Sequence, residues 1–157
     1  MDRRDIGSWL SGPKAALADQ GIDFGYPGQR FGMPQQGRGS VARMGRRFVA
    51  IALDWAAAIL VTNLVLPDLE YGSGDFAAAT LGVFGAHVFL LTATTGASFG
   101  YKIAGVRLIS ISRSRITFLK VLIRTALLCL AVPALIWDRD GRGVHDKAAG
   151  TITMRVR

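Results

Sequence analysis

The stretch RRFVAIALDWAAAILVTNLVL (residues 46–66) decides the fold class, because it is almost continuously apolar and yet carries an acid, Asp54, near its middle. An apolar run of about 17–25 residues is long enough to cross a bilayer as a helix. The segment 76–99 meets the same criterion. We therefore predict an all-α integral membrane protein with two full transmembrane helices, in residues 48–66 and 76–99.

A third apolar block, residues 116–137, is interrupted by Lys120 and Arg124. Its uncharged remainder is short for a full crossing, so we expect a shorter third helix that is tilted or re-entrant. Segments 105–111 and 150–156 alternate apolar and polar residues and are rich in β-branched side chains, which predicts a small cytoplasmic β pairing between them. This pairing returns the end of the chain to the cytoplasm; a topology with three crossings is the alternative.

The first 45 residues differ in composition from the rest. They are rich in glycine and proline and show little periodicity, which predicts an N-terminal arm that is flexible or docked on a partner. Within this arm, residues 11–19 could form a short helix, with proline in its first turn. Residues 46–157 then form the membrane domain.

The distribution of charge predicts the orientation in the membrane. The net charge is +8, and the loop at 67–75 between the predicted spans has acids and no base. Because basic residues remain in the cytoplasm, the N-terminus and the segment 100–117 should lie there, in a multi-pass protein of the plasma (inner) membrane. A basic cytoplasmic face also attracts anionic lipid headgroups. No nucleic-acid recognition motif is present. The bases that flank the spans are Arg38, Arg43, Arg46, Arg47, Lys102, Arg107, Arg113 and Arg115.

Asp54 requires a partner, since a lone carboxylate in hydrocarbon costs roughly 2.5–3.5 kcal/mol on insertion scales. Lys120 and Arg124 are four residues apart and share one face of the third helix. The forked guanidinium of Arg124 suits a carboxylate better than an ammonium does. We predict a structural Asp54–Arg124 ion pair that fixes which helices touch. The alternatives are that Asp54 exchanges a proton or cation along a membrane pathway, or that it helps to bind a lipid headgroup.

His87 falls near the centre of the second predicted span. A hydrogen bond to Thr62 or Asn63 of the first span is the simpler expectation, and a candidate ion or proton pathway through Asp54 and His87 is the alternative. Small residues at four-residue spacing allow helix backbones to approach closely. These residues are Ala52 and Ala56 in the first span, and Ala78, Gly82 and Ala86 in the second.

Residue types for catalysis or cofactor binding are sparse. No second histidine or cysteine stands at ligand spacing near His87, so we expect no metal site, no haem and no other cofactor. Cys129 lies in an apolar block and is expected to pack as a small hydrophobe. Ser98 and Ser110 have no base at readable spacing, and His145 belongs to a loop dipeptide with Asp146. The chain is therefore not expected to be an enzyme.

Four blocks of the sequence together resemble the RDD family of bacterial membrane proteins. They are RRFVAIALDW (46–55), GYKIAGVRLISI (100–111), IRTALL (123–128) and RGVHDKAAGTITMRV (142–156). The family is named for an arginine and two aspartates, which the resemblance assigns to Arg47, Asp54 and Asp146. The arm segment 26–45 is similar to that of actinobacterial members, whereas the stretch before the HD motif is shorter here than in longer members.

The resemblance implies little about activity, because only some members have been proposed to exchange sodium for protons. With Asp146 at the cytoplasmic surface, we predict an ion pair between Arg47 and Asp146 that joins the tail to the start of the first span; an exposed turn acid is the alternative. For function, we expect a non-catalytic accessory or assembly subunit of a larger membrane complex, with a respiratory complex as one candidate. A cation/proton antiporter or transporter component that uses Asp54 is the alternative, and a lipid-interacting protein is a third.

Overall fold

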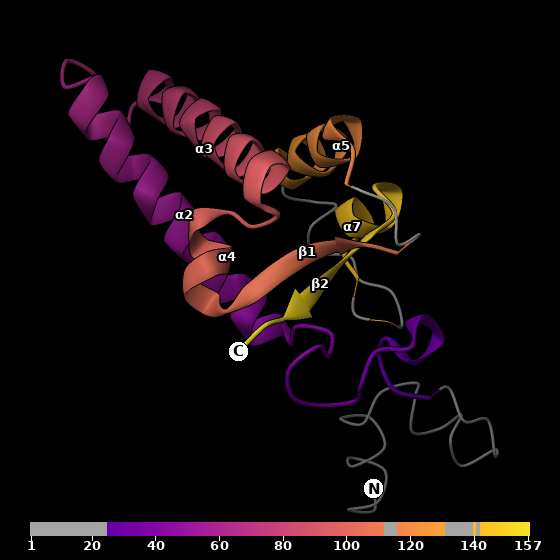
Figure 1. Ribbon diagram of the computed structural model, residues 1–157. Coiled ribbons are helices and arrows are strands. Elements are labelled where there is room, and N and C mark those ends of the chain that lie inside the picture. The colour runs from indigo at the N-terminus through magenta and orange to yellow at the C-terminus, as the bar shows by residue number, and fades with distance from the viewer. Residues whose placement is uncertain (1–24, 112–115, 131–139, 141) are drawn as a thin grey trace, which may run out of the picture.

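The computed structural model describes residues 25–111, 116–130, 140 and 142–157. The expected helix at 11–19 and the segment 131–139 lie outside these residues. Figure 1 shows the elements, which follow one another in this order: the 3-10 turn η1 (Gln29–Phe31), helices α2 (Met44–Val65), α3 (Gly74–Thr95) and α4 (Phe99–Ala104), strand β1 (Val106–Ser110), helices α5 (Phe118–Cys129) and α7 (Val144–Ala148), and strand β2 (Thr151–Arg155).

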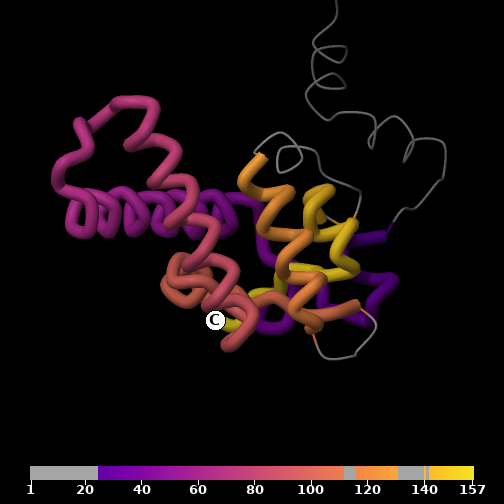
Figure 2. The backbone as a smooth tube through the Cα atoms, turned by 90° about the horizontal axis from the view of Figure 1, so that it is seen from above, coloured from indigo at the N-terminus to yellow at the C-terminus, as the bar shows by residue number. Residues whose placement is uncertain are grey.

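The two long helices correspond to the two predicted spans. Helices α2 and α3 have 22 residues each and are long and apolar enough to cross a membrane. Helix α3 ends earlier than predicted, at Thr95, because Gly96 takes a left-handed conformation with φ 75° and its N–H donates to the Thr92 carbonyl. Figures 1 and 2 both place the loop between α2 and α3 at the end of α2 that is far from the C-terminus.

Each long helix buries one narrow face, with buried residues three or four positions apart. On α2 these residues are Arg47, Ala50, Asp54, Ala58 and Thr62. On α3 they are Phe76, Thr80, Phe84, Val88 and Thr92. Ala58, Phe84, Val88 and Leu128 form one apolar cluster, which joins α2, α3 and α5.

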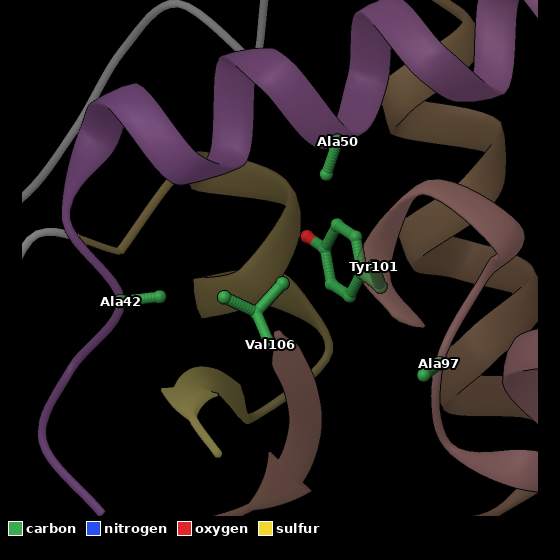
Figure 3. Close-up of a cluster of buried hydrophobic side chains, with 5 residues drawn as sticks. All are labelled: Ala42, Ala50, Ala97, Tyr101 and Val106. Carbon is green, nitrogen blue, oxygen red and sulfur yellow. The ribbon is translucent and has the colours of Figure 1, made fainter. Parts of the chain in front are cut away.

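A second apolar cluster lies at the basic end of α2. Figure 3 shows the Tyr101 ring among four smaller side chains, those of Ala42, Ala50, Ala97 and Val106. Tyr101 belongs to α4, whose close contact with α2 depends on Gly100: a Cβ at that position would lie 2.0 Å from the Ala50 carbonyl oxygen. Only glycine therefore allows these two backbones to approach so closely.

The predicted strand pairing is confirmed. Strands β1 and β2 are antiparallel, with Leu108 opposite Thr153. The arm continues this arrangement along the other edge of β2, where Val41 forms a bridge with Met154. Three main-chain hydrogen bonds of 2.8 Å hold it there: Gly39 N–H to Arg155, Arg155 N–H to Ser40, and Ala42 N–H to Thr153.

The docking of the arm corrects one expectation. From residue 25 onward the arm is not free, because its own chain binds it. Besides the hydrogen bonds to β2, Arg30 forms an ion pair with Asp140, and the Arg142 guanidinium lies 5.1 Å from the centroid of the Phe31 ring. Composition alone did not reveal this, since the edge of β2 exists only after β1 and β2 have formed.

Helix α5 is the shorter third helix that the interrupted block predicts. It has 12 residues, and at about 1.5 Å per residue it is roughly 18 Å long, which is less than the roughly 30 Å of hydrocarbon in a bilayer. One face is buried and includes Val121, Arg124 and Leu128, while Phe118 and Leu122 on the opposite face are exposed.

Candidate functional site

The Asp54 carboxylate lies buried where α2, α3 and α4 meet, with its charge met by hydrogen-bond donors. Its Oδ1 accepts from the Gly100 N–H at 2.7 Å and lies 3.2 Å from His87 Nε2, and its Oδ2 accepts from Ser98 Oγ at 2.5 Å. Ser98 also caps α4, since its Oγ accepts the Tyr101 N–H at 3.2 Å. One carboxylate therefore joins both long helices to the turn that starts α4.

The predicted Asp54–Arg124 pair is wrong. The structure places the Arg124 guanidinium against Asp146, with Nε donating to Oδ1 at 2.8 Å, while Asp54 is met by donors from α3 and the α3–α4 turn. The prediction considered only long cationic side chains. It missed the donors from Ser98 and Gly100, which a capped turn can direct at a carboxylate without adding a charge.

The expected partners of His87 are also wrong. Thr62 Oγ1 donates to the Ala58 carbonyl and Asn63 Nδ2 to the Ile59 carbonyl, both one turn back on their own helix. His87 instead uses Nε2 toward Asp54, and its Nδ1 lies 3.1 Å from the Val83 carbonyl oxygen. The two residues named as a candidate ion or proton pathway are thus adjacent.

Asp146 is the centre of a second buried cluster, at the basic end of the molecule. Its side chain is fully buried and forms ion pairs with Arg124 at 2.8 Å and with Arg47 at 3.3 Å. Thr151 and Thr153 of β2 place their hydroxyl oxygens 3.4 and 3.3 Å from its two carboxylate oxygens. The predicted Arg47–Asp146 pair is therefore present, with Arg124 as an additional cation.

The electrostatic balance at Asp146 favours the charged form. Burial by itself opposes a charged carboxylate, but the positive charges of Arg124 and Arg47 outweigh it, so the pKa of Asp146 lies below its ordinary value. Because two guanidinium groups share one buried carboxylate, they have more N–H donors than the carboxylate can accept. The Nε and Nη2 atoms of Arg47 are buried and have no hydrogen-bond partner among the described residues.

Tyr101 connects the two clusters. Its phenolic oxygen accepts a hydrogen bond from Arg124 Nη2 at 2.5 Å, and its N–H donates to Ser98, which in turn donates to Asp54. The Arg124 guanidinium lies 5.3 Å from the centroid of the Tyr101 ring. Sequence reasoning did not single out Tyr101. Its position in the block GYKIAG, three residues after the capping Ser98, was the available signal.

The side chains gathered at this site can hold charge and move protons. Among the described residues, no group of three or more histidine, cysteine, aspartate or glutamate side chains could hold a metal ion. Asp54 and His87 are one pair of adjacent groups whose side chains can exchange a proton, with His87 Nε2 3.2 Å from Asp54 Oδ1. Further hydroxyl groups on the buried faces lack a partner within the described part of the chain, namely those of Thr80, Thr92 and Thr125.

The small residues do not mediate contact between the two long helices. Ala52 and Ala56 on α2 are exposed, as are Ala78, Gly82 and Ala86 on α3. The contact between α2 and α3 uses larger side chains instead, with the Trp55 and Phe84 rings 5.3 Å apart.

Comparisons with protein-family models, with curated proteins and with solved structures give no match. The resemblance to the RDD family therefore rests on its four sequence blocks alone.

Proposed function

We propose that the chain is a non-catalytic integral protein of the plasma membrane and that α2 and α3 cross this membrane. In this proposal it serves as an accessory or assembly subunit of a larger membrane complex. Insertion is supported by the large apolar side chains that point away from the fold. Leu60 and Leu64 on α2 are 70% and 79% exposed, and Leu90 on α3 is 58% exposed. A continuous apolar surface of this kind is unfavourable in water and suits hydrocarbon.

The proposed orientation places the N-terminus in the cytoplasm. Arg43, Arg46 and Arg47 lie at one end of α2, together with the β pairing, while the acidic loop lies at the other end. Helix α5 is too short to cross and would be tilted or re-entrant, returning the chain to β2 on the basic side. Membership of the RDD family is part of this proposal; its support is that Arg47, Asp54 and Asp146 occupy two linked buried clusters.

The outward face of small residues on α3 carries the accessory-subunit proposal. Ala78, Gly82 and Ala86 are exposed at four-residue spacing, and a Cβ at Gly82 would meet nothing within 4 Å. In a bilayer, such faces allow another helix to approach closely, whereas lipid contact does not require them. The hydrogen bonds to Asp54 come from its own chain, which supports a structural role for that acid and leaves the exposed face for partners.

Purification from gently solubilised native membranes tests this proposal through the mass of the recovered particle. We expect a particle heavier than a monomer, and we expect Gly82→Leu to release it because the added side chain blocks close approach. The matched control is Ala77→Leu, which enlarges an exposed small residue on another side of α3. A monomeric wild-type protein, or equal effects of the two variants, would contradict the proposal.

A cation/proton antiporter or transporter component is the second candidate function. The observation that favours it is the approach of His87 Nε2 to Asp54 Oδ1 at 3.2 Å, inside the two candidate spans. Intramembrane acids and histidines that are paired in this way form proton relays in transporters. The hydroxyl groups of Thr80 and Thr92, which have no hydrogen-bond partner among the described residues, lie on the same helix as His87 and would extend a polar path.

Flux measurements in proteoliposomes separate this candidate from a purely structural role. If Asp54 and His87 carry protons, pH-driven sodium or proton flux should disappear in Asp54→Asn and in His87→Gln, which retains a hydrogen-bonding side chain. Asn63→Ala changes an exposed polar residue of the same span and should transport normally. Transport by Asp54→Asn at the wild-type rate would exclude the antiporter.

A further inference from the structure

A cavity lies at the basic end of the molecule, between the docked arm, the start of α2 and the end of β2. Its volume is about 590 Å³, within the range of small-molecule sites. Three arginines line it: Arg43 at the cap of α2, Arg46 in α2 and Arg155 in β2. No acidic residue of the described part of the chain lines it. Tyr26, Gln35 and Gln36 of the arm supply hydrogen-bonding side chains at its wall.

The arginines of this cavity are not neutralised by any acidic side chain in the described part of the chain. None of the three arginines forms an ion pair with an aspartate or glutamate there. Arg46 Nη1 donates at 2.7 Å to the Ala104 carbonyl at the end of α4, and Arg155 Nε donates to the Arg157 carbonyl. The Ala104 carbonyl is neutral, so the charge of Arg46 and its remaining N–H donors stay available for an anion.

The position of the cavity indicates which anion would reach it. Arg43 precedes the first residue of α2, and the exposed apolar surface of that helix begins only a few residues later, at Phe48 and Val49. A phosphate group in the cavity would therefore lie at the depth of the headgroups, with acyl chains beside α2. Arginine matches phosphate in a forked geometry, and anionic lipids concentrate on the cytoplasmic leaflet.

We propose that this cavity binds the phosphate-containing headgroup of an anionic phospholipid, with Arg43, Arg46 and Arg155 contacting the phosphate and the arm covering it. The inference rests on the proposed membrane insertion but not on the proposed partner complex. It gives the docked arm a role, because the hydrogen bonds between residues 39–42 and β2 hold one wall of the site.

Lipid binding to the purified, delipidated full-length chain in a neutral detergent tests this site. We expect phosphatidylglycerol to bind about tenfold more tightly than phosphatidylcholine, as charge-assisted hydrogen bonds to phosphate predict when the headgroup carries a net charge. Arg43→Gln and Arg155→Gln should each remove most of that preference. Arg38→Gln is the matched control, because Arg38 is an exposed arginine of the same arm that does not line the cavity.

The outcomes separate a built site from general basicity. An equal loss in Arg38→Gln and Arg43→Gln would overturn the proposal in favour of diffuse attraction. Tight binding of free glycerol phosphate that displaces the lipid would overturn it in favour of a soluble phosphate ligand. Since the isolated chain is measured, loss of the partner complex leaves this result unaffected, whereas failure of the chain to enter vesicles of any composition would disprove membrane insertion itself.

Discussion

At the scale of single residues, the two buried aspartates have different kinds of partner. Asp54 is met by a serine hydroxyl, a main-chain N–H and a histidine, whereas Asp146 lies between two guanidinium groups. A carboxylate buried between apolar helices cannot pair with an arginine unless a neighbouring element carries one to the same position. The start of a capped helix can replace the arginine, because its hydroxyl and main-chain N–H donors belong to a segment that already packs against the carboxylate.

Asp146→Asn should destabilise the fold strongly, because Arg124 and Arg47 would lose the buried anion between them. Removing one partner of a buried ion pair typically costs about 3–5 kcal/mol. Thermal unfolding of the detergent-solubilised protein measures the loss. Asp68→Asn, in the exposed loop after α2, is the control and should leave the midpoint near that of the wild type. A wild-type midpoint in Asp146→Asn would show that the cluster contributes nothing to stability.

The lowered pKa of Asp146 also predicts a dependence of stability on pH. The folded-state pKa lies below the unfolded value of about 3.9, so the stabilisation is complete above that value and declines as pH falls toward the folded pKa. Denaturant midpoints measured from neutral to acidic pH should decrease in the wild type. They should decrease less in Asp146→Asn, and parallel profiles for the two proteins would contradict the prediction.

At the scale of elements, the short helix α4 connects α2 with α5. It begins at the Ser98 cap, which also holds Asp54, and its Tyr101 side chain reaches Arg124 of α5. Its C-terminal carbonyl at Ala104 accepts from Arg46 of α2. The register of α4 against α2 therefore decides whether both buried clusters can form at once.

Gly100→Ala should disrupt this junction, because its Cβ would overlap the Ala50 carbonyl. Overpacking a tight contact costs typically about 1–3 kcal/mol, and here the displaced partner is backbone. Gly45→Ala is the control: Gly45 is also helical, but a Cβ there meets nothing within 4 Å. Unfolding midpoints of the two variants should differ clearly, with Gly45→Ala at or above the wild type. Equal midpoints would show that α4 does not pack closely on α2.

At the scale of the whole molecule, the β pairing determines which parts of the chain share a side. Strand β2 lies between β1 and the arm, so the start of α2, the segment after α3 and the end of the described chain lie together. The loop after α2 lies at the other end of a helix about 33 Å long, as its 22 residues require.

Cysteine labelling from either face of the membrane tests this arrangement in a Cys129→Ala background. Cysteines at Arg38 and Lys147 should react with a membrane-impermeant reagent from the same side, and a cysteine at Tyr71 from the opposite side. Permeabilised cells supply the control for total reactivity. Labelling of the Lys147 position from the side that labels Tyr71 would support three crossings instead and would contradict the pairing of β2 with the arm.

The sequence by itself determined the features that depend on local composition: two apolar runs of spanning length, a shorter basic third helix, and two alternating strands that could pair. It also indicated the Arg47–Asp146 pair, through the resemblance of its motifs. Only the tertiary structure decided that Asp54 is met by His87, Ser98 and Gly100, because hydrogen-bond donors from turns have no spacing rule that links them to a distant acid. The docking of the arm likewise required a sheet edge, which exists only once residues far apart in the chain have come together.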